Sequence, residues 1–231
     1  MTDIINWGNV FEQSSNFQSN NPTKWAFVKN FVNGNFYEEL YKTFPKFDDT
    51  WSSEDSYDKV SYRKFWKRDD ELTIITENDS RYSESWNEFM NHLWSEEFIT
   101  NLVKFTKVSI TNLRHFCYMY QNKGGFQSPH IHNVSDMTLI VFIYFSKNWS
   151  KGDPGGTYLS EGRDESKILF EVDDLDNTAL FVLDGPDAAH GVRQIQKNVE
   201  KRAIQLTYEP FSMEDGWYSK PRIEIPKKLD L

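Results

Sequence analysis

The pattern of hydrophobic and polar positions changes character at about residue 108. Before it, the stretch from Ser83 to about Phe105 repeats apolar residues at steps of three and four, which is the spacing of an amphipathic helix. After it, short apolar and β-branched runs alternate with turns rich in Gly, Asp, Asn and Pro, which is typical of strands. The pattern predicts a helical first half joined to a β-rich second half.

The first 82 residues carry shorter signals. The opening twenty residues are polar and are expected to be loosely ordered. A short strand is predicted from Trp25 to Val28, followed by a helix from about Phe36 to Thr43 that ends near Pro45. Residues 46–82 are rich in Asp, Ser, Arg and aromatic residues without a clear period, so we expect a long lid or a loop that contacts the substrate.

The second half is predicted to contain seven or eight short strands. Their sequences are HFCYMY, DMTLIVFIYF, GGTYL, KILFEV, TALFVL, GVRQI and RAIQLTYEP. None of the connections between them is long enough to carry a crossover helix, which argues against a parallel sheet. The predicted fold class is therefore mainly β with flanking helices (α+β), a sandwich or barrel of the jelly-roll type with the helices on one outer face.

The length and composition fit one soluble domain. The 231 residues divide into a helical and loop region at 1–107, a β core at 108–212 and a tail at 213–231. A net charge of −9 provides no basic field for a nucleic-acid backbone, and no run approaches the roughly 20 apolar residues of a membrane span. Neither nucleic acid nor a membrane is an expected partner, and the sequence leaves the oligomeric state open.

The single cysteine and the N-terminus bear on the compartment. Cys117 cannot form an internal disulfide, and it lies in an apolar run where a buried thiol is expected. The N-terminus lacks the basic start and the long apolar stretch of a signal peptide. We therefore expect a cytoplasmic protein.

Two histidines lie one residue apart in the segment SPHIHN. Residues i and i+2 of a strand point to the same face, so His130 and His132 would project together. His190, which follows a turn and begins a strand, can supply a third inward imidazole. Three nitrogen ligands on one face of a metal leave other positions for oxygen or substrate, as in non-haem iron sites. Paired surface histidines give the same pattern, so on this ground alone both interpretations stay open.

Arg202 adds a second chemical group. It lies twelve residues after His190 on a predicted strand, where it shares a face with Ile204 and Leu206. If that face points inward, the arginine needs an anionic partner, because an unpaired buried charge is costly. Its planar guanidinium suits a carboxylate. A surface arginine in an alternating strand is the other interpretation.

Taken in order, these motifs resemble those of the Fe(II)- and 2-oxoglutarate-dependent dioxygenases, particularly the prolyl-4-hydroxylase-like branch. The resemblance runs from about Leu113 to Pro210. It rests on CYMYQNKGGFQSPHIHN, on VFIYFSKNW followed by GGTYL, and on AHGVRQI followed by KRAIQLTY. The segment WAFVKNFVNGNFYEELYKTFP is similar to the usual entry to such domains. The resemblance implies a double-stranded β-helix core, cupin-like, with N-terminal helices packed on it.

The resemblance also implies a chemistry and its residues. His130 and His190 would bind Fe(II), and Arg202 would form a salt bridge with the distal carboxylate of 2-oxoglutarate. Tyr144 and Tyr120 match tyrosines that line the cosubstrate pocket. The implied enzyme is a hydroxylase that releases succinate and carbon dioxide, acting on an unidentified small molecule, amino acid or peptide.

One position departs from the family's usual His-x-Asp motif. His132 stands where the carboxylate would be, which makes a metal site one charge unit more positive. The outcome is a three-histidine iron site, a site whose third position is open, or a core that no longer catalyses. Asp136, Asp184 and Asp187 lie nearby in the sequence and could supply an oxygen ligand. Two other functions stay open: a three-histidine cupin-like dioxygenase that needs no 2-oxoglutarate, and a non-catalytic jelly-roll binding module.

Overall fold

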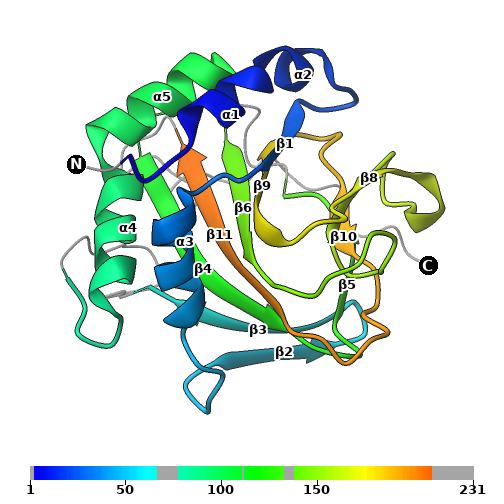
Figure 1. The fold of residues 1–231 in the computed structure, drawn as a ribbon. Helices are drawn as coiled ribbons and strands as arrows, with labels where there is room; N and C mark the ends of the chain where they lie inside the picture. Colours follow the sequence, from blue (N-terminus) through cyan, green and yellow to red (C-terminus); the bar gives the residue numbers. More distant parts are fainter. Residues whose placement is uncertain (1–2, 67–77, 111, 133–137, 210–231) are drawn as a thin grey trace.

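The computed structural model describes residues 3–66, 78–110, 112–132 and 138–209. Figure 1 shows the arrangement of its helices and strands. The helices are α1 (Trp7–Glu12), α2 (Ser14–Ser19), α3 (Gly34–Lys42), α4 (Glu84–Trp94) and α5 (Glu96–Thr106), with a 3-10 helix η1 (Glu165–Lys167). The strands are β1 (Trp25–Lys29), β2 (Ser52–Ser56), β3 (Lys59–Phe65), β4 (Asn112–Gln121), β5 (Phe126–His130), β6 (Leu139–Phe145), β7 (Thr157–Ser160), β8 (Ile168–Glu171), β9 (Asp176–Leu183), β10 (His190–Val192) and β11 (Lys201–Glu209).

The strands pair antiparallel in one curled sheet. Their order is β1-β9-β6-β11-β4-β3-β5-β10-β7-β8, with β2 paired to β3. Figure 1 shows the sheet bending so that β5 and β10 lie on the side away from the helices. The strands β4 to β11 form the predicted jelly roll, and the prediction of a mainly β fold with flanking helices is confirmed.

The long helical stretch of the first half is divided in two at Ser95. The backbone of Ser95 is extended, with ψ of 152°, and its hydroxyl oxygen accepts a hydrogen bond from the Phe98 amide at the start of α5. Ser83 caps α4 in the same way by accepting from the Trp86 amide. The apolar spacing runs across the break because both helices bury their apolar residues in the same core, so the periodicity alone could not locate the boundary.

Two expectations for the first third of the chain are wrong. The opening segment is not loosely ordered: α1 and α2 bury Val10 and Phe17, and the Phe17 ring lies 5.0 Å from that of Phe105. Part of the expected loop at 46–82 is the hairpin β2–β3, which joins the main sheet by pairing with β4 and β5. Residues 67–77 of that segment lie outside the described residues.

Buried side chains fall into two clusters on opposite faces of the sheet. The helix face packs against α1 to α5, and its strand residues include Phe116, Tyr118, Leu139, Val141, Ile143, Phe145, Ile204, Leu206 and Tyr208. The inner face, which the curled sheet encloses, has its own cluster: Cys117, Met119, Ile140, Phe142, Tyr144, Leu159, Val172, Leu175, Leu180, Val182, Ala188 and Ala203. Alternate residues of β4, β6 and β11 therefore face different environments.

Four further expectations concern single features of the chain. Cys117 is buried as expected, and burial raises the pKa of its thiol to about 12. In the part of the chain that the structure describes, no helix is long and apolar enough to cross a bilayer. Asp136 and the predicted tail at 213–231 lie outside the described residues.

Candidate metal centre

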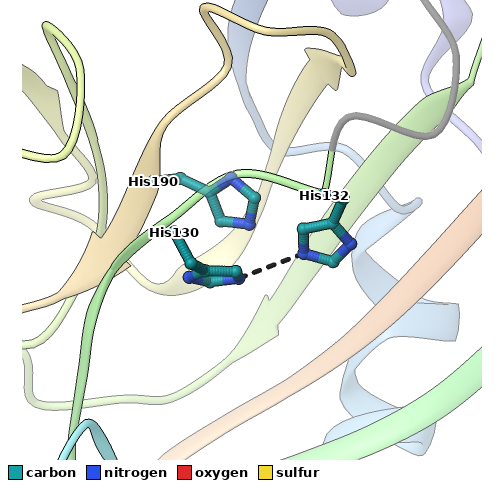
Figure 2. Close-up of side chains that lie close together, drawn as sticks. All are labelled: His130, His132 and His190. Carbon is teal, nitrogen blue, oxygen red and sulfur yellow. Dashed lines mark hydrogen bonds between the residues drawn. The ribbon is translucent and has the colours of Figure 1, made fainter. Parts of the chain in front are cut away.

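Three histidines converge on the inner side of the barrel. His130 ends β5, His132 follows two residues later, and His190 begins β10 directly opposite His130. One ring nitrogen from each lies within 4.8 Å of the others. Figure 2 shows the three rings gathered around one point, with His130 Nε2 3.0 Å from His132 Nε2. The structure therefore brings together all three histidines that the sequence singled out.

The nearby aspartates do not join this group. Over the described ranges, the residues gathered with metal-ligand spacing are the three histidines, and neither Asp184 nor Asp187 is among them. Asp136 lies outside the described residues. The donor set that the described chain offers is therefore three imidazole nitrogens.

A β-bulge aims His130 at the other two rings. His190 pairs with His130, and Val192 pairs with Gln127, so three steps along β5 oppose two along β10. The extra residue in β5 reverses the phase of the strand between Gln127 and His130. Both side chains thus reach the same side, where the Gln127 amide nitrogen is 3.2 Å from His130 Nε2. The sequence pattern H-x-H gives no sign of this bulge.

Backbone carbonyls fix the tautomers of two of the rings. His130 Nδ1 lies 3.2 Å from the Ser128 carbonyl oxygen, and His190 Nδ1 lies 2.9 Å from that of Ala188. A carbonyl can only accept, so each Nδ1 carries the proton and each Nε2 keeps a free lone pair. This second contact is how metal-binding histidines are usually oriented.

The protonation and spacing of the rings fit a transition-metal ion. Burial, assisted by the neighbouring His190, lowers the pKa of His130 to about 3. Burial also lowers the pKa of His132 and of His190, so all three are neutral near pH 7. Two nitrogens bound to one ion at about 2.1 Å and at right angles would be about 3.0 Å apart, which is the spacing of His130 Nε2 and His132 Nε2.

Arg202 does not point into the barrel, and this corrects the sequence interpretation. Its side chain, 31% exposed, is paired with Glu200, with Nε 2.9 Å from a carboxylate oxygen. The guanidinium carbon lies 5.8 Å from the ring centres of both Tyr41 and Phe44. Arg202 does share a face with Ile204, as predicted, but that face packs against the helices.

Tyr120 is also on the helix face rather than in the barrel. Its ring stacks on Phe47 with centres 4.6 Å apart, and its hydroxyl donates to Glu200 at 3.2 Å. The inward positions of β4 are the alternate ones, which are occupied by Cys117 and Met119. The expectation that Tyr120 lines the same pocket as the histidines is therefore wrong.

The inward cation at this end of β11 is Lys201, which the sequence reasoning missed. Its side chain is 2% exposed, and its Nζ has no hydrogen-bond partner among the described residues. Burial lowers the pKa of Lys201 to about 7, with Glu171 opposing the shift. The small and polar residues Ala203 and Gln205 share its phase. That pattern was the available signal that the odd positions of β11 face the inner side of the barrel and the even positions face the core under the helices.

Tyr144 faces inward and links Lys201 to the histidines along β6. The Lys201 Nζ lies 6.0 Å from the centre of the Tyr144 ring. Two residues earlier, the Phe142 ring contacts that of His190 at 5.9 Å. Residues two apart on a strand are about 7 Å apart, so the ammonium and the histidines lie at neighbouring positions along one inner surface.

The fold is that of 2-oxoglutarate oxygenases. A prolyl-4-hydroxylase from Pseudomonas putida is similar over 89% of this chain and 100% of its own, with a TM-score of 0.59 and 9% identity. A prolyl hydroxylase from Trichoplax adhaerens, solved with a hypoxia-inducible factor peptide, matches over 88% and 91%, with a TM-score of 0.62 and 14% identity. HygX from Streptomyces hygroscopicus, solved with nickel, 2-oxoglutarate and hygromycin B, matches over 86% of both chains, with a TM-score of 0.54 and 12% identity.

The likeness is one of structure. No protein-family model matches the sequence, and no curated protein matches it either. At 9 to 14% identity the similarity establishes the double-stranded β-helix fold and leaves the activity to be argued from the site.

Proposed function

We propose that this chain is a non-haem Fe(II)- and 2-oxoglutarate-dependent oxygenase that hydroxylates a small molecule, an amino acid or a peptide and releases succinate and carbon dioxide. The observation that carries the proposal is the Lys201 ammonium, buried without a hydrogen-bond partner on the same inner surface as three neutral histidines. A charge in that position is costly unless an anion accompanies it. A metal ion bound by the histidines and a diacid paired with Lys201 would satisfy both groups.

The residues divide the binding between them. His130, His132 and His190 would hold Fe(II) through three nitrogens, leaving its remaining positions open. Lys201 would receive the far carboxylate of 2-oxoglutarate, in place of Arg202, and Tyr144 would pack beside it. HygX binds a metal and 2-oxoglutarate on a similar fold, which supports the pairing of these two ligands. Once bound, Fe(II) and 2-oxoglutarate supply the oxygen chemistry.

The chain itself supplies orientation and a dry environment. The carbonyls of Ser128 and Ala188 hold two imidazoles with Nε2 free, and the inner cluster around Phe142 excludes water from the neighbouring surface. Lys201 fixes the far end of the cosubstrate, so its reactive end meets the metal in one orientation. Because His132 is neutral where a carboxylate would be charged, the site is one unit more positive and favours the dianionic cosubstrate.

The test is spectroscopic binding followed by a product measurement. The anaerobic protein is mixed with Fe(II) and 2-oxoglutarate, and the expected result is a weak visible charge-transfer band with one Fe(II) per chain. Air is then admitted, and succinate is measured by mass spectrometry. Iron binding without the band contradicts the proposal. Oxygen uptake without succinate would instead favour the three-histidine dioxygenase that needs no 2-oxoglutarate, and a folded chain that binds no iron would favour the binding module.

A further inference from the structure

The inner face of the barrel carries a second cationic group, on β3. Strand alternation puts Lys59, Ser61 and Arg63 on one side of β3. Arg63 lies opposite Met119 of β4, and Met119 belongs to the inner cluster. The side chains of Lys59 and Arg63 are only 15% and 17% exposed. Two cations from the hairpin β2–β3 therefore face the barrel interior rather than bulk water.

This group lies next to the three histidines. Lys59 pairs across the sheet with Gln127 of β5, and the amide nitrogen of Gln127 is 3.2 Å from His130 Nε2. In Figure 1, β3 lies between β5 and β4, and it pairs with both strands. A ligand held here would lie beside a metal at the histidines.

The charges of this group do not cancel. Glu54 of β2 offers one carboxylate oxygen, Oε2, to both cations: Lys59 Nζ is at 2.5 Å and Arg63 Nε at 3.0 Å. The same oxygen accepts a hydrogen bond from the Ser61 hydroxyl at 3.0 Å. Arg63 Nε lacks the alignment of a hydrogen bond despite its distance. One carboxylate thus serves two largely buried cations, and the group keeps one positive charge.

The outer side of the same strand shows what an ordinary charge pattern looks like here. Lys64, adjacent to Arg63 but pointing the other way, donates to Thr50 Oγ1 at 2.6 Å and lies 3.9 Å from Asp48. One cation there meets one anion. On the inner side two cations share one carboxylate, so a bound anion would balance the remaining positive charge.

We propose that Arg63 and Lys59 form a subsite for a carboxylate group of the substrate, placed beside the metal. This inference rests on the proposed oxygenase function and adds its substrate class: a carboxylate-bearing molecule. The subsite is separate from Lys201, which lies on β11 as a single, fully buried cation. The planar guanidinium of Arg63 offers a carboxylate two parallel hydrogen bonds, and Lys59 adds a point charge. Lys201 orients the cosubstrate, and Arg63 and Lys59 orient the molecule that is oxidised.

The experiment uses acetate, labelled with carbon-13 at its carboxyl group, as the probe and acetamide as its neutral counterpart. The full chain is loaded with paramagnetic Mn(II) and saturated with 2-oxoglutarate, and broadening of the probe's carbon signal reports its approach to the metal. We expect saturable broadening for acetate and none for acetamide. Arg63→Gln is expected to weaken acetate binding about tenfold, as the loss of a charged hydrogen bond predicts, and Lys59→Gln provides a second variant. Lys64→Gln is the matched control and should bind acetate like the unmodified chain.

The outcomes separate the subsite from the function. Acetate broadening that is absent, or that persists unchanged in both Arg63→Gln and Lys59→Gln, overturns the carboxylate subsite. The visible band of the Fe(II) and 2-oxoglutarate complex is recorded for the same variants. A band that forms normally while the acetate result is negative leaves the oxygenase proposal standing. If the band fails in every protein, the oxygenase proposal falls, and the Arg63 dependence of acetate binding to the Mn(II) form without 2-oxoglutarate still decides the subsite.

Discussion

The two faces of β11 carry adjacent cations in opposite situations. Lys201 points into the barrel, 2% exposed and without a hydrogen-bond partner in the described structure. Arg202, one residue later, lies on the helix face, paired with Glu200 and packed over Tyr41 and Phe44. On the helix face Arg202 is paired within the chain, whereas on the inner face Lys201 has no hydrogen-bond partner among the described residues. That contrast supports the proposal that ligands bind on the inner face.

The largest expected effect removes a histidine from the inner face. His190→Ala deletes one of the three proposed metal ligands, so we expect the variant to lose stoichiometric Fe(II) binding while keeping its far-UV circular dichroism. His92→Ala, which removes a histidine of α4 on the helix side, should leave the iron stoichiometry at one. The measurement is metal content after desalting. Full iron content in His190→Ala would take that residue out of the site.

The next effect compares the two neighbouring cations directly. Lys201→Met removes the charge proposed to hold the far carboxylate of 2-oxoglutarate, and a hydrogen bond to a charged group accounts for about 2 kcal/mol or more. We expect the dissociation constant for 2-oxoglutarate, followed by the visible band, to rise at least about 30-fold. Arg202→Met should change it less than about twofold, because its partners are Glu200 and two aromatic rings. Equal increases of the dissociation constant in the two variants would contradict the proposal that the inner face, and not the helix face, binds 2-oxoglutarate.

The last effect is on stability, and here the removal of Lys201 is expected to stabilise the protein rather than impair it. Burial lowers the pKa of Lys201 in the folded chain to about 7, whereas an unfolded lysine has a pKa of about 10.4. Between these values the unfolded state binds the extra proton, so the free energy of unfolding rises with pH by up to about 1.4 kcal/mol per unit. Lys201→Met lacks this dependence and should be more stable than the unmodified chain at pH 7 without ligands. Chemical denaturation between pH 7 and 9 measures both; a less stable variant with an unchanged pH slope would contradict the burial argument.

Much of this architecture could be predicted from the sequence. The spacing of apolar residues indicated the jelly-roll strands and the helical stretch before them, and the positions of His130, His132 and His190 indicated the cluster that the structure forms. The strands and helices could be predicted because burial of one face makes apolar residues recur with the period of the element. The cluster could be predicted because two histidines one residue apart with a distant third form a recognisable ligand spacing.

The assignment of faces could not be obtained in the same way. Both faces of β11 are buried, so alternation separates Lys201 from Arg202 without saying which is inside. The large apolar residues Ile204 and Leu206 suggested an interior, but they mark the side that packs on helices. In a sheet with helices on one side and a site on the other, the smaller and more polar set, here Ala203 and Gln205, marks the site. The same reasoning, applied to β4, would have excluded Tyr120 from the pocket and left Tyr144 as the expected pocket tyrosine.

The bulge in β5 also has a consequence for how this site can change in evolution. Because the extra residue at Ser128 or Pro129 sets the phase of everything that follows it, a single-codon deletion there would turn His130 toward the opposite side while sparing its codon. Insertions or deletions in the hairpin loop before Phe126 would leave that phase intact, since the bulge is downstream of them. The segment that carries His130 is thus tolerant of length variation before Phe126 and intolerant of it at the bulge.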